Sequence, residues 1–275
     1  MKNKGKKHQK QIMWILFGII YIVACTSCVG ASAPAETLVN TETLANIEMQ
    51  LDDKENNAPI EEDLPTNTII HVDDTLNSNM AGMLQEIVKG TIVQIQMNQV
   101  SGSGVIWRQE EEKLVIVTAA HVLAEDSGFV QITFADGYEV ESVEYSIETS
   151  SDVAFVYVPM EKIAQAHMSQ YCLVNVNKDK YDEIQNGDIV IVCGSVSEPG
   201  GDAYEGTLIE NWIWVEDFNQ YMMLAKMVAE AGMSGGAVFD EEGYFLGILC
   251  GVNENDEAAI LPLIIIESAY LEQVQ

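Results

Sequence analysis

Residues 232–236 read Gly-Met-Ser-Gly-Gly and lead into an apolar run that begins at Ala237. A serine flanked by glycines fits a tight turn that exposes backbone N–H groups, because glycine adopts backbone conformations that other residues avoid. Alone, such a turn is weak evidence for any function. Its interpretation depends on which histidine and carboxylate residues accompany it and on their order in the chain.

Two upstream motifs supply these residues, each beside an apolar run typical of a buried strand. Residues 118–122 read Thr-Ala-Ala-His-Val, and residues 151–154 read Ser-Asp-Val-Ala. A serine hydroxyl is a poor nucleophile, so a neutral imidazole must take its proton and later return it to the leaving amine. A carboxylate on the other ring nitrogen fixes the tautomer and stabilises the imidazolium. The turn would present backbone N–H groups of Gly232 and Ser234 to a developing oxyanion.

The order of the three motifs separates the folds that use such residues. Residues 232–236 also fit the Gly-Xaa-Ser-Xaa-Gly elbow of α/β-hydrolases, but that fold places its histidine after the serine. The last histidine here is His167, which excludes that fold. Subtilisins place Asp before His before Ser and alternate strands with helices, and this alternation is not seen. The order His121, Asp152, Ser234 on a strand-rich chain leaves the chymotrypsin arrangement.

The remaining pattern is typical of strands. Apolar and polar residues alternate at 93–97 and at 130–134, and Asp136-Gly137 is a hairpin signal. We count six candidate strands between residues 91 and 158 and about six more at 171–176, 189–193, 206–215, 221–228, 237–252 (a hairpin) and 259–263. This pattern predicts an all-β sandwich or a pair of barrels. A short helix is expected at 80–88, with residues 83, 84, 87 and 88 on one face, and a closing helix at 268–274.

On these motifs the sequence resembles the trypsin-like serine proteases, specifically the bacterial HtrA (Deg) branch. The likeness covers about residues 85–275 and rests on residues 101–106, 118–122, 151–158, 232–238 and 247–249. It implies two six-stranded antiparallel barrels, with His121 as general base, Asp152 as its orienting partner and Ser234 as nucleophile. Residues 225–231 depart from the usual HtrA pattern, and we find no segment for a PDZ domain.

The resemblance also indicates where a substrate side chain would bind. In this fold the residue six before the nucleophile lies at the floor of the pocket for the side chain preceding the cut bond, which gives Val228. The opposite wall would come from Gly251, Val252 and Ala259. An apolar, narrowed pocket predicts cleavage after residues such as Ala, Val or Leu, because a buried ammonium without a counter-charge is costly.

The N-terminus predicts export. A lysine-rich start precedes an apolar run from Ile12 to Ala24, and residues 22–25 (Ile-Val-Ala-Cys) resemble the lipobox at which bacterial lipoproteins are lipidated, here on Cys25. A lipoprotein, an uncleaved anchor and a fully released protein all remain open. We predict three regions: residues 1–31 as signal peptide or membrane anchor, 32–79 as an acidic flexible linker and 80–275 as a protease domain.

The composition of the chain limits the kinds of ligand and partner that we expect. The chain carries 43 acidic against 13 basic residues, so nucleic acid is not expected as a partner. Four scattered histidines lack ligand spacing, and we expect neither metal nor cofactor. Outside the leader, Cys172, Cys193 and Cys250 lie in apolar runs and are predicted to be inert core thiols.

Together these features predict an exported, membrane-tethered serine endopeptidase that acts on polypeptides at the bacterial cell surface or outside the cell. The alternative is a catalytically silent protein of the same fold that binds peptides or a partner there. An intact set of His121, Asp152 and Ser234 with a glycine-rich turn favours the enzyme. The oligomeric state and the physiological substrate stay open.

Overall fold

The computed structural model describes residues 14–15, 74–123, 128–142, 144–165, 167–168 and 171–273. The predicted leader (1–31) and linker (32–79), including Cys25, lie outside these residues apart from β1 (Trp14–Ile15) and the start of α1 (Asp74–Val88). Over the described part of the chain, no helix has the length and apolar character needed to cross a membrane.

The first half of the body is one antiparallel sheet with the order β6-β5-β2-β3-β4-β8-β7. Its strands are β2 (Ile92–Met97), β3 (Val100–Glu110), β4 (Lys113–Ala119), β5 (Val130–Thr133), β6 (Glu139–Ser142), β7 (Tyr145–Glu148) and β8 (Val153–Pro159). Among the described residues, its end strands β6 and β7 are not paired with each other, so the sheet forms a half-barrel.

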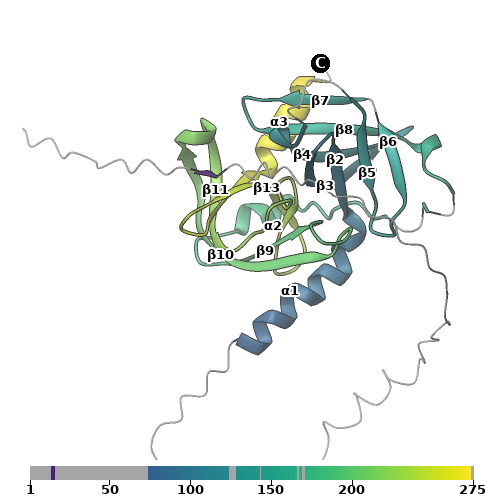
Figure 1. Ribbon diagram of the computed structural model, residues 1–275. Coiled ribbons are helices and arrows are strands. Elements are labelled where there is room, and N and C mark those ends of the chain that lie inside the picture. Colours follow the sequence, from purple (N-terminus) through teal and green to yellow (C-terminus); the bar gives the residue numbers. More distant parts are fainter. Residues whose placement is uncertain are drawn as a thin grey trace, which may run out of the picture. The chain divides into compact units, whose positions relative to one another are not determined.

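The second half is a closed barrel. Its strands are hydrogen-bonded in the order β13-β12-β9-β10-β11-β14, and β14 pairs back onto β13. They are β9 (Ile189–Gly194), β10 (Asp202–Val215), β11 (Gln220–Met227), β12 (Ala237–Asp240), β13 (Phe245–Asn253) and β14 (Glu257–Pro262). The half-barrel is blue and teal in Figure 1, whereas the closed barrel is green and yellow. At the edge of β13, Ile15 of β1 pairs with Val252.

The all-β fold and the closed six-stranded barrel are confirmed, and the first sheet differs from the prediction. It has seven strands, because β7 was not expected, and it is a half-barrel. All four residues of β7 are partly exposed, so no alternation between apolar and polar residues marks this strand. The predicted strand at 171–176 is instead extended chain with one isolated bridge, between Asn175 and Tyr244.

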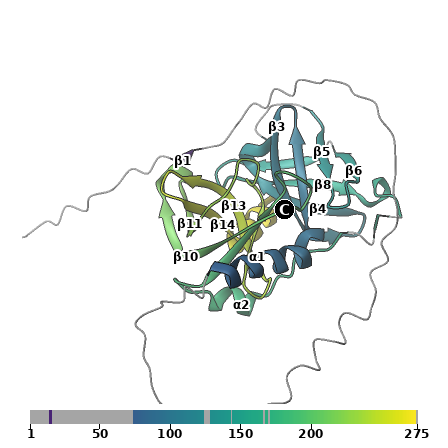
Figure 2. The ribbon, with the colours of Figure 1, turned by 60° about the horizontal axis from the view of Figure 1, so that its bottom comes forward.

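Helix α1 begins at Asp74 rather than at residue 80 and lies against β10 (Figure 2). Its buried residues are Ala81, Leu84 and Val88, whereas Met83 and Ile87 are 61% and 74% exposed. Of the four residues predicted to form the buried face, Leu84 and Val88 are buried and Met83 and Ile87 are not. A packed helix buries positions spaced three and four apart, and here small Ala81 begins the buried stripe.

Helix α3 (Leu263–Gln273) follows the closed barrel and joins it to the half-barrel. Its Tyr270 ring contacts Phe155 of β8 at 5.0 Å and Trp107 of β3 at 5.3 Å between centroids. The guanidinium of Arg108 lies 3.4 Å from the Trp107 ring centroid. The predicted closing helix exists and begins five positions earlier than expected, at Leu263 instead of Ser268.

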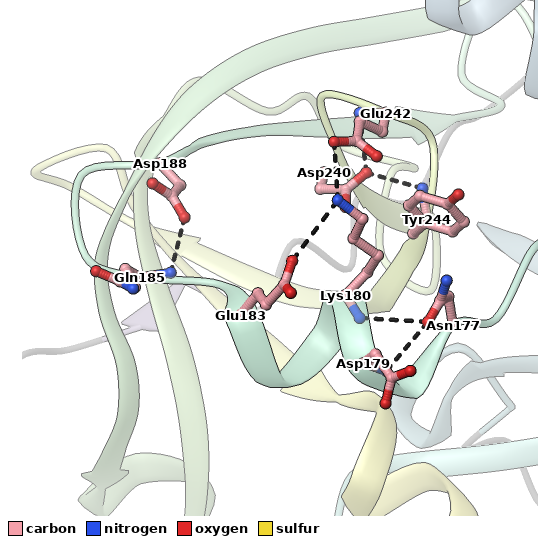
Figure 3. A network of polar contacts seen from close by, with 9 residues as sticks. All are labelled: Asn177, Asp179, Lys180, Glu183, Gln185, Asp188, Asp240, Glu242 and Tyr244. Carbon is pink, nitrogen blue, oxygen red and sulfur yellow. Dashed lines mark hydrogen bonds and ion pairs between the residues drawn. The ribbon is translucent and has the colours of Figure 1, made fainter.

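A polar network holds the short helix α2 (Lys178–Glu183) on the barrel (Figure 3). The Asn177 side chain caps the helix by accepting from the N–H of Asp179 at 3.1 Å and of Lys180 at 3.3 Å. The Lys180 ammonium lies 3.1 Å from Glu242, in the turn between β12 and β13, and 3.6 Å from Glu183. The Lys180–Glu242 ion pair therefore links this helix to the turn between β12 and β13, and Tyr181 packs against the core. Short 3-10 helices complete the fold at Lys89–Thr91, Ala120–Leu123, Met160–Lys162 and Glu216–Phe218.

Candidate active site

The pairing of β4 with β8 brings His121 and Asp152 together. Ala119 at the end of β4 pairs with Val153 at the start of β8, so the residues just beyond each strand end are neighbours. His121 Nδ1 lies 3.0 Å from Asp152 Oδ2 and 3.1 Å from Oδ1. The backbone N–H of His121 also donates to Oδ1 at 3.1 Å. A proton on Nδ1 directed at this carboxylate leaves the lone pair on Nε2, as a general base requires.

Asp152 holds an uncommon backbone conformation. Its φ is +49°, in the left-handed region that a non-glycine residue adopts at a cost of about 1–3 kcal/mol. The surrounding contacts maintain it: the carbonyl of Asp152 accepts from Ala120 N–H at 3.1 Å. From the other barrel, the Gln220 side chain donates to the Ser151 hydroxyl at 3.2 Å. The carboxylate thus occupies a position that the fold enforces.

Cys250 on β13 makes a further contact with this carboxylate. The residue is 1% exposed, and its thiol lies close enough to Asp152 for the carboxylate to affect the pKa of the thiol. Burial raises the pKa of the Cys250 thiol well above its usual range, and the neighbouring Asp152 charge raises it further. The sequence predicted Cys250 as a core thiol and a neighbour of the pocket, but gave no sign of this contact.

The turn around Ser234 has the backbone shape that its glycines permit. Gly232 and Gly235 have φ of +100° and +83°, in the left-handed region. A Cβ on Gly235 would lie 2.3 Å from the Ser103 carbonyl oxygen and 2.2 Å from Thr118 Oγ1, so only glycine fits. The N–H of Gly235 donates to Leu249 O at 2.7 Å, which ties the turn to β13.

Buried Ser103 on β3 joins this turn to the half-barrel. Its N–H donates to Ser234 O, and its hydroxyl donates to Gly232 O, both at 2.8 Å. The same hydroxyl accepts from Ser195 N–H at 2.9 Å, at the end of β9. Both residues that carry the predicted oxyanion N–H groups are therefore fixed through their carbonyl oxygens.

Gly102 shows how close the two halves come. A Cβ at this position would lie 2.7 Å from the side chain of Val122 and 3.1 Å from Ser234 O. Val122 directly follows His121, so the His121 segment and the Ser234 turn meet across Gly102. The structure thus brings His121 and Asp152 into contact and sets the Ser234 turn beside them.

Of the predicted pocket residues, three lie on neighbouring strands and the fourth, Val228, is exposed. Gly251 pairs with Ala259, and Val252 with Ala258, so the predicted wall forms on the neighbouring strands β13 and β14. Val228 follows β11 directly and is 56% exposed, more than expected of a pocket floor. In the part of the chain that the structure covers, no three His, Cys, Asp or Glu side chains are grouped to hold a metal ion.

Comparisons with known proteins identify the family of the chain. The family model described as "Trypsin-like peptidase domain" matches residues 102–248. A "Serine protease HtrA-like" protein from a bovine strain of Staphylococcus aureus is 29% identical over 162 residues, which cover 54% of this chain and 20% of the relative. Same-named proteins from other Staphylococcus aureus strains are 28% identical over the same length. The matched region therefore spans about a fifth of these relatives.

Solved structures show the same fold. An inactive-form crystal structure of Rv3671c from M. tuberculosis, carrying a serine-to-alanine change, superposes with a TM-score of 0.56 at 19% identity. The superposed region covers 73% of this chain and 93% of the Rv3671c chain. The inactive form of the Rv3671c protease gives a TM-score of 0.55 at 19% identity, over 73% of this chain and 96% of that chain. At this identity the likeness concerns the fold alone.

The three body cysteines are expected to differ in reactivity, since the thiolate is the nucleophile. Cys172 is exposed, which corrects its predicted place in the core. Burial raises the pKa of Cys193 to about 12 and that of Cys250 well above its usual range. Iodoacetamide at mildly alkaline pH should therefore modify Cys172 in the native protein and spare the other two, as peptide-mapping mass spectrometry would show. Denatured protein, in which all three react, is the control. Native modification of Cys250 as fast as Cys172 would contradict its burial.

Proposed function

The chain belongs to the family of trypsin-like peptidase domains, and on that premise we propose that it is a serine endopeptidase that uses His121, Asp152 and Ser234. The observation that carries the proposal is the contact of His121 Nδ1 with both carboxylate oxygens of Asp152, at 3.0 and 3.1 Å. That pair lies beside a glycine-shaped turn that bears a serine.

The proposed reaction has two halves. Ser234 Oγ attacks the peptide carbonyl carbon while its proton passes to His121 Nε2, and the N–H groups of Gly232 and Ser234 bind the oxyanion. His121 then gives the proton to the leaving amine as the C–N bond breaks, which leaves an ester on Ser234. Water attacks this ester with the same base and releases the acid. Loss of one oxyanion donor typically raises the barrier by about 2.7–4 kcal/mol.

Asp152 would act by holding the imidazole and by stabilising its protonated form. Two contacts of Asp152 support this role, with the His121 ring and with the His121 N–H. Because its buried thiol lies beside the carboxylate, Cys250 would serve as a positioning residue. It touches neither the substrate nor the reacting atoms in this scheme.

The edge of β13 supports binding of the substrate as an extended chain. Residues Val252 and Asn253 pair with Ile15 and Trp14 of β1 in antiparallel register, so this edge accepts a peptide backbone. Addition of a strand to a sheet edge gives affinity through main-chain hydrogen bonds, and side-chain pockets give selectivity. Polypeptides in extended conformation are thus the proposed substrate class.

The first prediction concerns the nucleophile. Ser234→Ala should abolish both peptidase activity and labelling by a fluorophosphonate, because the probe reacts quickly only with an activated serine. His121→Ala should be comparably damaging, since the two residues act as a unit. Ser268→Ala, an exposed serine on α3, is the matched control and should label like the wild type. Labelling that persists in Ser234→Ala would refute the assignment, and a wild type that never labels would point to the catalytically silent alternative.

The second prediction concerns selectivity. We propose cleavage after small or medium apolar residues, because Val252 and Ala259 narrow the predicted pocket and the pocket residues provide no counter-charge for a buried ammonium. A peptide-library digest should give cuts after Ala, Val or Leu. Val228→Asp should add cleavage after Lys or Arg, whereas Val176→Asp, at another exposed position, should not. Dominant cleavage after Lys or Arg by the wild type would contradict the pocket assignment.

We also propose export and tethering to the membrane, by a lipid on Cys25 or by an uncleaved anchor, with residues 32–79 as spacer. The support is the sequence pattern of residues 1–31. Cys25→Ser should abolish lipid labelling and cause precursor to accumulate if the lipid is the tether. Unchanged size and unchanged membrane retention would support the anchor, and recovery of the wild type in the medium would contradict tethering. Cys28→Ser is the matched control.

A further inference from the structure

The β10–β11 hairpin exposes three aromatic side chains that contact one another. Trp212, Trp214 and Tyr221 are 45%, 48% and 41% exposed. Trp212 stacks on Tyr221 at 5.0 Å with an interplanar angle of 8°, and Trp214 meets the same ring edge-on at 5.2 Å. Single exposed apolar side chains are ordinary, whereas a contiguous aromatic surface marks an interaction site. We call these three residues the aromatic patch.

The aromatic patch faces away from the candidate active site. Trp214 and Tyr221 are paired across the hairpin, so their side chains share one face. The adjacent residue Gln220 contacts Ser151, next to Asp152, from the hairpin's other face. Successive side chains of a strand point to opposite faces. Changes in the aromatic patch therefore leave the contact between Gln220 and Ser151 in place.

A hollow of about 300 Å³ adjoins the aromatic patch. Its apolar lining includes Trp212 itself and Ile264 of α3, which is 47% exposed. The remaining lining residues come from α2, the segment after it and β10: Tyr181, Asp182, Ile184 and Asn211. An apolar side chain can enter this hollow while its neighbours lie over the aromatic rings.

The hollow is bordered by negative charge. Asp182 lines it, and Asp182 and Glu267 lie close enough to the Tyr181 phenol to add to the effect of burial, which raises the pKa of Tyr181 to about 12. Of the two lysines of α2, Lys180 is paired with Glu242 and Glu183 (Figure 3), and Lys178 is exposed at the first position of the helix. The chain as a whole has a formal charge of −30. A second copy or an anionic lipid surface would therefore meet repulsion here, and a cationic ligand would be attracted.

We propose that the aromatic patch and its hollow form a docking site for a cationic, partly apolar polypeptide segment. Lysine or arginine side chains would lie over the faces of Trp212 and Trp214, where the ring quadrupole attracts a cation. Their charges would be matched by Asp182 and Glu267, and an apolar neighbour would fill the hollow beside Ile264. This site is separate from the catalytic residues, and its occupancy needs no peptide-bond cleavage.

The test is a binding measurement on the full chain carrying Ser234→Ala, so that the probe stays intact. The probe is a fluorescently labelled peptide of alternating lysine and leucine, and a glutamate–leucine peptide is its matched control. We expect saturable binding of the first peptide, weakened by salt, and no binding of the second. Added Trp212→Ala should weaken binding by about tenfold or more. Phe129→Ala, an equally exposed aromatic on the half-barrel, should leave it unchanged.

Asp182→Asn is a second variant, which removes a charge without removing apolar surface. It should also weaken binding of the lysine–leucine peptide. Equal affinity in Trp212→Ala and the parent would show diffuse attraction to the acidic surface and overturn the proposal. Self-association, or co-sedimentation with phosphatidylcholine vesicles, that Trp212→Ala abolishes would assign the patch to another occupant and also overturn it. Because none of these readouts requires hydrolysis, failure here is distinguishable from failure of the proposed peptidase function.

Discussion

The hydrogen bonds of buried Ser103 are the constraint on which the candidate site depends. One residue of β3 binds the carbonyls of Gly232 and Ser234, accepts from Ser195 and, through its own carbonyl, accepts from Thr118 at 2.7 Å. It thereby connects the half-barrel, the end of β9 and the serine turn. Removing a partner from a buried polar group costs its full desolvation penalty, so these contacts are mutually enforced.

This constraint explains why the site needs both halves of the molecule. His121 and Asp152 come from paired strands of the half-barrel, whereas Ser234 comes from a turn of the closed barrel. Several links join the halves, among them Ser103 at the site, Gln220 with Ser151, and Tyr270 of α3 against Trp107 and Phe155. The strained backbone of Asp152 is sustained only within such an over-determined setting.

The motifs were readable from the sequence because each is local and marks a strand end or a turn. The glycines at 232 and 235 indicate positions of positive φ, as the structure has them. The alternation of apolar and polar residues indicates the strands of the barrels. What the sequence could not show depends on distant contacts. The partners of Ser103 lie 92 and 129 residues away, and the thiol of Cys250 meets Asp152 only after two sheets have assembled. Likewise, the exposure of Cys172 and Val228 is decided by neighbours that no local pattern specifies.

Under the proposed functions, polypeptides would be recognised both through their backbone and through their side chains, and the β10–β11 hairpin borders both proposed surfaces. The edge of β13 offers hydrogen bonds that any extended chain can satisfy, so it selects conformation more than sequence. Selectivity must then come from side-chain surfaces nearby. On one face of the hairpin Gln220 donates to Ser151, beside Asp152, and on the other face the stacked rings of Trp212 and Tyr221 are exposed to solvent. A strand pair that is fixed on its inner face can present rigid aromatic rings on its outer face with little loss of side-chain freedom on binding. This rigidity is what makes exposed aromatic residues effective in recognition.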